Sequence, residues 1–272
     1  MNMLRDNRFI IIFCFGIIIA VSLVFHKRVS ELLSFRPLYV AKTSGNRLST
    51  IASSTQKKNT SVKSPEVKEK FKPAYIGRDP AEIRPIYEEV KLFSDTQKNK
   101  LYEEIRVNAR AVQDDPTYLF GWVQIGLLKK IIGDYEGAGD AWEYAGVIRP
   151  ANSVSFANLG ELYWKYLPDY ARSEKNFRIS IKNKPDDPDV YIALSNLYFF
   201  SYKEKTRFAD DVLLEGIRAN PKDVNLLKSL ASLYEQQADY IKAVEWWKKA
   251  LEKEPDNKDI ILRIETLAKK TN

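Results

Sequence analysis

The chain has 272 residues and a formal net charge of +7, from 43 lysines and arginines against 36 aspartates and glutamates. The excess lies in the first 72 residues, because residues 73–272 carry 30 basic and 32 acidic side chains. A nucleic-acid-binding protein needs positive charge on the folded surface that meets phosphate, so we expect no nucleic-acid partner.

One cysteine, Cys14, and one histidine, His26, limit the chemistry of the chain. This inventory excludes an intramolecular disulfide, a cysteine cluster, a serine–histidine–aspartate triad and a histidine-rich zinc site in the folded part. Carboxylate or lysine chemistry is not excluded by counting, but no spacing proposes it. We therefore expect no metal, no cofactor and no enzymatic activity.

An apolar run follows the short N-terminal tail, residues 1–8. Residues 9–25 are seventeen side chains without a charge, and basic residues flank them on both sides. At about 1.5 Å per residue, a helix of this length is close to the minimum that crosses a bilayer core, so we predict a transmembrane anchor. A cleaved signal peptide is the alternative. It is disfavoured because His26-Lys27-Arg28 stands where a cleavage site with small residues is expected.

These features predict a single-pass membrane protein with an N-terminal anchor. Its orientation stays open, because lysines and arginines flank both ends of the span and the positive-inside rule does not choose between them. The short N-terminal tail favours an extracytoplasmic folded part, whereas the basic residues after the span favour the opposite side.

Residues 26–78 are predicted to be a disordered basic linker rich in serine, threonine and lysine. Between residues 42 and 72, eight basic side chains stand against two acidic ones, with few large apolar side chains. Such a composition cannot bury enough apolar surface to offset the ordering of the backbone. Two roles stay open for this linker: a solvated spacer, or attraction of its basic side chains to anionic lipid headgroups.

Residues 79–116 are predicted to form a divergent helical hairpin that caps the folded part. Ser94 and Gln97 have the spacing of a capping box, in which side chain and backbone bond reciprocally in the first turn of a helix. Leu101, Ile105 and Val112 lie along the helix that follows.

Prolines then recur with gaps of 34, 35, 36 and 34 residues, from Pro116 to Pro255. A fixed period in this range is typical of repeat architectures. Between the prolines the same residue types return: a large apolar residue, an aliphatic one and a small one, then a small and a large apolar residue on a second segment. In chain order, these positions hold Trp122, Ile125, Gly126, Ala138 and Trp142; Phe156, Leu159, Gly160, Ser173 and Phe177; Tyr191, Leu194, Ser195, Ala209 and Leu213; Leu227, Leu230, Ala231, Ala243 and Trp247.

This pattern predicts two packed helices in each unit. Trp122, Ile125 and Gly126 share one face of a first helix, and Ala138 and Trp142 share one face of a second. The small residues let the two helices approach closely around the large ones. Proline ends each unit because it cannot continue a helix, and neighbouring units stack because one hairpin cannot bury both of its faces.

The pattern resembles that of the tetratricopeptide repeat (TPR) family. The resemblance covers about residues 117–257 and implies an all-α solenoid of about four helical hairpins. Two units depart from the family's pattern: the second has one extra residue and the third has two in the turn between the helices, and Ser173 stands where alanine is typical. Residues 258–272 are predicted to be a C-terminal capping helix that packs through Ile260, Ile261, Ile264 and Leu267.

Proteins that resemble this family mostly bind peptide segments or partner helices on a concave face, which the first helix of each hairpin lines. Val123 and Leu127 stand where a clamp for terminal carboxylates needs polar donors. We therefore expect an extended or amphipathic ligand that buries apolar side chains. The predicted groove is apolar at its start and polar at its end, and its residues are Phe120, Val123, Leu127, Asn158, Glu161, Trp164, Asn196, Phe199, Lys228, Ser232 and Glu235.

Together these features predict a membrane-tethered scaffold for protein–protein interactions. Its groove binds a protein or peptide ligand during assembly or recruitment of a membrane-associated complex. Two alternatives stay open. One is an accessory subunit of a membrane or envelope enzyme, for example of glycosyltransferase type, and the other is a protein that binds an envelope polymer or lipid.

Overall fold

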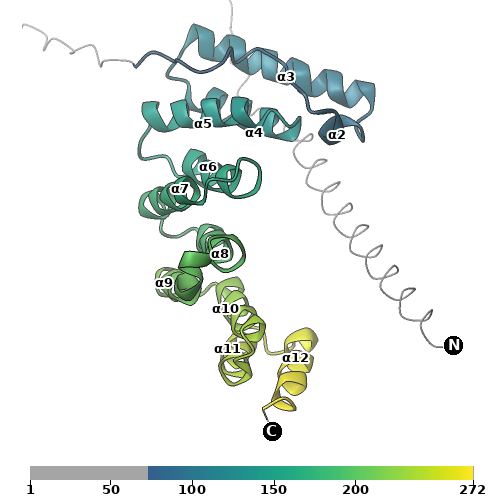
Figure 1. Ribbon diagram of the computed structural model, residues 1–272, viewed down its shortest axis with the longest axis vertical. Helices are drawn as coiled ribbons and strands as arrows, with labels where there is room; N and C mark the ends of the chain where they lie inside the picture. The colour runs from purple at the N-terminus through teal and green to yellow at the C-terminus, as the bar shows by residue number, and fades with distance from the viewer. Residues whose placement is uncertain (1–72, 272) are drawn as a thin grey trace, which may run out of the picture. The chain divides into compact units, whose positions relative to one another are not determined.

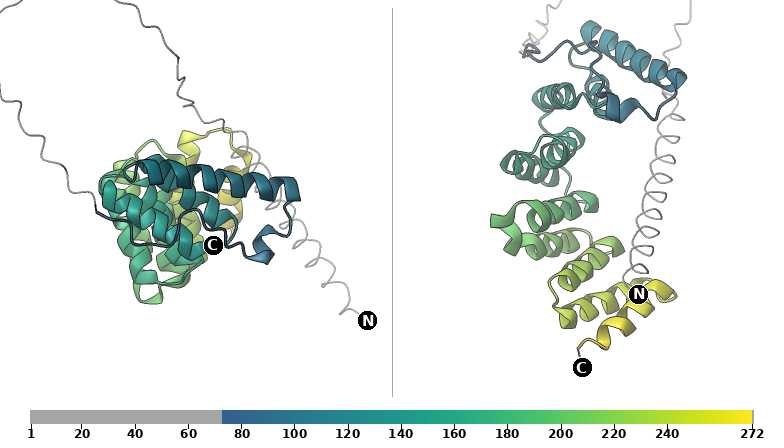
Figure 2. Two further views of the ribbon diagram at one scale, coloured as in Figure 1. Left: turned by 90° about the horizontal axis from the view of Figure 1, so that it is seen from above. Right: turned by 45° about the vertical axis from the view of Figure 1, so that its right-hand side comes forward.

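The computed structural model describes residues 73–271, and within this range it consists of eleven α-helices, α2 to α12, with one π-helical and one 3-10 segment and no strand (Figure 1). The helices form hairpins that pack on their neighbours in chain order, as Figures 1 and 2 show. This arrangement is the all-α, TPR-like solenoid that the repeat pattern predicted. The predicted tail 1–8, the anchor 9–25 and residues 26–72 of the linker lie outside the described residues.

Four hairpins follow one another between residues 119 and 253. A single helix, α12, follows the four hairpins and packs on α11. The hairpins are α4 (Leu119–Ile131) with α5 (Tyr135–Ile148), α6 (Val154–Lys165) with α7 (Tyr170–Asn183), α8 (Pro188–Asn196) with α9 (Ala209–Ala219), and α10 (Val224–Gln236) with α11 (Tyr240–Lys253), before α12 (Lys258–Ala268).

Aspartates fix where the second helix of three hairpins begins. Asp134, Asp169 and Asp239 each accept a hydrogen bond from a backbone N–H in the first turn, at 3.0, 3.0 and 3.2 Å. Such caps satisfy backbone donors that a helix start leaves without a partner. The third hairpin has no such cap. Its helices are joined by a π-helical segment, η1 (Leu197–Ser201), and a 3-10 segment, η2 (Lys203–Phe208). These two segments hold the two extra residues that the sequence placed in a turn.

Glycine and serine set the distance between the two helices of a hairpin. A Cβ atom at Gly126 would lie 2.3 Å from Nε1 of Trp142, and one at Gly160 would lie 2.5 Å from the ring of Phe177. Ser173, which departs from the alanine of the pattern, is fully buried and donates to the carbonyl of Gly160 at 2.6 Å. The departure therefore keeps the close approach and satisfies the buried hydroxyl group.

The predicted N-terminal cap differs from a hairpin. Its first helix, α2 (Tyr87–Val90), is a single turn, whereas α3 (Asp95–Asp114) is long and packs on α4. The capping box at Ser94 is present: Gln97 N donates to Ser94 Oγ at 3.3 Å and Ser94 N donates to Gln97 Oε1 at 2.8 Å. Prolines at 80 and 85 interrupt the segment before α2, which prevents a longer first helix.

Residues 73–78 were predicted as the end of the disordered linker, whereas in the structure they contact the first hairpin. Pro73 accepts a hydrogen bond from the Tyr144 hydroxyl at 2.8 Å, and the ring of Tyr75 lies 4.5 Å from that of Trp122. The backbone N–H of Arg78 donates to Asp140 at 3.2 Å. A few aromatic and charged contacts order this segment, and a composition averaged over the whole linker does not register them.

Between residues 73 and 271, no helix combines the length and the apolar character that crossing a bilayer requires. This finding contradicts the predicted single-pass membrane localisation, which is corrected accordingly. The segment on which that prediction depended, residues 9–25, lies outside the described residues.

Candidate functional site

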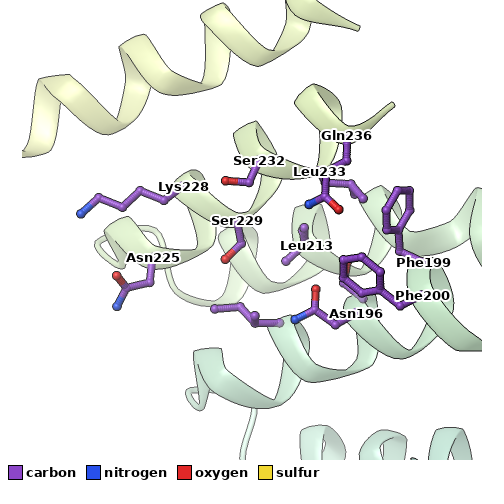
Figure 3. A pocket seen from close by; sticks show the side chains of 12 residues that line it. Asn196, Phe199, Phe200, Leu213, Asn225, Lys228, Ser229, Ser232, Leu233 and Gln236 are labelled. Atoms are coloured by element: carbon purple, nitrogen blue, oxygen red, sulfur yellow. The ribbon is translucent and has the colours of Figure 1, made fainter. Parts of the chain in front are cut away.

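A pocket of about 230 Å³ opens between the first helices of the third and fourth hairpins (Figure 3). Residues of helices α8, α9 and α10 and of the π-helical segment η1 line it. Figure 3 shows the side chains of α10 on one side and those of α8 and η1 on the other. The lining residues are Ile192, Ser195, Asn196, Phe199, Phe200, Leu213, Asn225, Lys228, Ser229, Ser232, Leu233 and Gln236.

Helix α10 contributes a polar stripe to this pocket. Asn225, Ser229, Ser232 and Gln236 follow one another at spacings of four, three and four residues. These spacings place all four on one face of an α-helix. The opposite face of α10 carries Leu230, which is fully buried in the core. The packing of the hairpin therefore directs the polar stripe toward the pocket.

The π-helical segment supplies the aromatic side of the pocket. The backbone N–H of Tyr202 donates to the carbonyl of Leu197 at 2.8 Å, five residues back, which defines the wider turn. The rings of Phe199 and Phe200 lie 5.0 Å apart and nearly perpendicular, at 83°. Phe200 keeps 51% of its surface exposed although it is a large apolar residue. An aromatic pair at the opening of a pocket is a ready contact for an apolar side chain.

The amide groups of the pocket differ from three asparagines that join segments of the repeats. Asn152, Asn183 and Asn220 donate from their side chains to backbone carbonyls that join neighbouring segments. The side chains of Asn196 and Asn225 make no hydrogen bond to the part of the chain that the structure describes, and the same holds for Ser229, Ser232 and Gln236. The fold thus uses the first group of amides and leaves the second group available.

The pocket is close to electrically neutral. Its lining contains no carboxylate, and its single cationic side chain is Lys228. The Lys228 ammonium lies 2.7 Å from Glu254 Oε2. This hydrogen bond holds the pKa of Glu254 below its ordinary value, so the carboxylate stays charged and balances the lysine at neutral pH.

The structure brings four of the predicted groove residues together. Asn196, Phe199, Lys228 and Ser232 line the pocket. They stay predicted ligand contacts, now in a common site. The other seven lie outside it: Phe120, Val123, Leu127, Asn158, Glu161, Trp164 and Glu235.

Several of these seven residues have partners within the fold. Val123 and Leu127 are half-buried and pack against core clusters of the first two hairpins. Trp164 Nε1 donates to Ser201 Oγ at 2.8 Å. Arg263 pairs with Glu235 at 2.8 Å, and the indole N–H of Trp247 donates to the same carboxylate. At the predicted apolar start of the groove, Val123 and Leu127 are thus held in packing, whereas Phe120 keeps 49% of its surface exposed.

Glu161 also serves the packing of neighbouring hairpins. Its carboxylate lies 2.8 Å from Lys130 Nζ and 3.0 Å from Lys165 Nζ. Burial acts to raise the pKa of Glu161, but the two lysines outweigh this effect and lower the pKa below its ordinary value. A carboxylate bound by two ammonium groups is a poor candidate for a third cation from a ligand.

The sequence analysis missed Asn225, Ser229, Gln236 and Phe200. The first three share the helical spacing of Ser232, so extending the stripe by steps of three and four residues would have found them. Phe200 depends on the π turn, for which the repeat pattern carries no signal.

These features define the class of protein: the described residues form a TPR-like helical solenoid with a pocket on its first helices. No protein-family model matches the chain. The solved structure of yeast Tom70 superposes with a TM-score of 0.51 at 14% sequence identity, over 64% of this chain and 37% of that chain. This similarity shows the fold alone.

Two curated proteins are similar in sequence. The formate-dependent nitrite reductase complex subunit NrfG of Escherichia coli O157:H7 is 28% identical over 104 residues, which cover 38% of this chain and 52% of NrfG. Tetratricopeptide repeat protein 37 of Xenopus laevis is 27% identical over 163 residues, which cover 60% of this chain and 9% of that protein. The chain thus spans about half the length of NrfG and less than a tenth of the length of tetratricopeptide repeat protein 37.

Proposed function

We propose that this protein is a protein-interaction module that binds a segment of a partner protein in the pocket between α8, η1 and α10. The observation that carries the proposal is the group of polar side chains with no partner in the described part of the chain, next to two phenylalanines. Hydrogen-bonding groups that the fold does not use, set beside apolar surface, are typical of binding sites.

We propose that the protein binds its partner and catalyses no reaction in this pocket. The side chains that line the pocket offer amides, hydroxyls, aromatic rings and one paired lysine. General acid–base or nucleophilic catalysis needs a titratable or activated group aimed at the substrate, and this lining supplies neither a carboxylate nor an imidazole nor a thiol.

We further propose that the module acts within a multiprotein assembly by recruiting a partner. NrfG is, by its name, a subunit of the formate-dependent nitrite reductase complex. The similarity to NrfG supports a role through association for the present chain, with partners of its own.

Selection from a phage-displayed library of random nine-residue peptides on the immobilised full-length protein tests this function. We expect enriched peptides that bind the wild type and bind the Phe200→Ala variant about tenfold more weakly, since an aromatic contact and its apolar area are lost. Leu262→Ala, which removes another apolar side chain that is 63% exposed but lies on α12, serves as the matched control and should bind as the wild type does. Failure to enrich any peptide, or equal losses in both variants, would overturn the proposal.

A further inference from the structure

We infer that the pocket recognises an uncharged, extended stretch of polypeptide about five residues long, through its main chain and one apolar side chain. The inference rests on the proposed function and specifies the chemistry of its ligand. Four properties of the pocket carry it: the length of the polar stripe, the kind of polar group, the charge and the aromatic pair.

The stripe on α10 sets the length of the ligand. From Asn225 to Gln236 the helix advances eleven residues, which at 1.5 Å per residue is about 16 Å. An extended chain advances about 3.3 Å per residue, so about five residues lie along the stripe.

The polar groups select an extended main chain over a helix. The carboxamides of Asn196 and Asn225 each carry a donor and an acceptor, as does each peptide unit of an extended chain. A helical ligand uses its main-chain groups internally and would leave these amides without partners. Because Asn196 and Asn225 give up no hydrogen bond within the described residues, a strand-like ligand can bond to them without breaking the fold.

The charge of the pocket selects a neutral ligand. A charged ligand side chain would lose hydration on entering the pocket and find no free opposite charge, since Lys228 is paired with Glu254 at 2.7 Å. Binding that depends on amides and rings changes little with ionic strength, because salt screens interactions between charges. We therefore expect a ligand without charged residues at its centre and without need of a free terminal carboxylate.

The aromatic pair selects the side chain. Phe199 is half-buried and Phe200 is 51% exposed, and their rings stand nearly perpendicular. Leu213 and Leu233 continue this apolar surface into the pocket, and both are buried. An aromatic or large aliphatic side chain of the ligand buries its surface here while its own main chain faces the amides.

The test uses peptides from the selection described above, resynthesised with acetylated N-termini and amidated C-termini and measured by fluorescence anisotropy on the full-length protein. We expect dissociation constants that change less than about twofold between 50 and 500 mM NaCl. Asn196→Ala and Asn225→Ala should each weaken binding about fivefold, as the loss of one net hydrogen bond predicts. Asn99→Ala, on an exposed position of α3, removes an amide outside the pocket and should leave binding unchanged.

N-methylation of single main-chain amides in the peptide gives a readout that side-chain effects cannot mimic. Methylation at one or two central positions should weaken binding about tenfold, because the methyl group removes the donor. Bound peptides that turn helical by circular dichroism, affinities that fall more than tenfold with salt, or indifference to the two asparagine variants would overturn the inference. Any of these results leaves peptide binding itself in place, whereas failure to select a peptide removes the proposed function as well.

Discussion

At the scale of single residues, the close helix pairs depend on side chains that are missing or very small. Trp142 is fully buried and fixed by a hydrogen bond from its Nε1 to the carbonyl of Val123 at 3.1 Å. It therefore cannot move aside for a side chain at Gly126. Gly139, in the second helix of the same hairpin, has more room, because a Cβ there would lie 3.3 Å from Leu162.

Gly126→Ala and Gly139→Ala should accordingly have different effects on stability. The new Cβ at position 126 overlaps the Trp142 ring, so we expect the free energy of unfolding to fall by about 1–3 kcal/mol. At position 139 a terminal methyl group can give way and alanine favours the helix, so a change below about 1 kcal/mol is expected. Urea denaturation followed by circular dichroism measures both. Equal stability of the two variants would contradict the close contact.

At the scale of elements, a buried ion pair holds the segment before α2 on the first hairpin. Lys129 and Asp134 are each 2% exposed, and their charged atoms lie 2.8 Å apart. Lys129 Nζ also donates to the carbonyl of Glu82 at 2.7 Å, and Asp134 caps α5. Lys129 occupies the position at which the next three hairpins have Tyr163, Tyr198 and Tyr234.

Lys129→Met tests how strongly this pair stabilises the fold. We expect a loss of about 3 kcal/mol in the free energy of unfolding, because Asp134 is left as a buried charge without its main partner. Adding Asp134→Asn to Lys129→Met should recover part of the loss, since the amide is neutral and can still cap the helix. Thermal and urea unfolding of the two single variants and the double variant measure the coupling. Additive losses would show that the pair acts as two independent groups.

The elements also show what the sequence can predict. Prolines, small residues and large apolar residues at fixed spacing act within one hairpin, so the pattern predicted the TPR-like fold. The order of residues 73–78 depends on contacts with Trp122 and Asp140, which are far away in sequence and leave no local pattern. Contacts between segments also half-bury Val123 and Leu127, whose place in the groove stays a prediction.

The candidate site was predicted only in part, because the prediction depended on regular helix geometry. Asn196, Phe199, Lys228 and Ser232 follow from the faces of regular helices, and the structure brings them to one pocket. Phe200 depends on a π turn at the end of α8, where the regular geometry behind the prediction no longer applies.

At the scale of the described solenoid, stability is expected to be local, because each hairpin packs mainly on its neighbours in sequence. Leu230 is fully buried within a core cluster that extends from α7 through the third and fourth hairpins to α12. The first hairpin contributes to separate clusters around Trp122 and Trp142.

Leu230→Ala should therefore weaken one end of the solenoid selectively. We expect the free energy of local opening to fall by about 2–5 kcal/mol in α7 through α12, because buried apolar surface is lost there. Amide hydrogen exchange read by mass spectrometry should show faster exchange there and unchanged exchange in α4 and α5. A uniform increase across residues 73–271 would indicate that the described part unfolds as one unit.

The π turn at Leu197–Ser201 bears on how a binding specificity arises in a repeat protein. A substitution changes the side chain at one groove position. The π turn instead places an additional residue at the end of the first helix, and through it Phe200 lines the pocket beside Phe199. The other three hairpins end their first helices without such a segment. The aromatic side of the pocket thus depends on the length of the chain between α8 and α9, and we expect that grafting residues 197–208 into another hairpin would carry Phe199 and Phe200 with it.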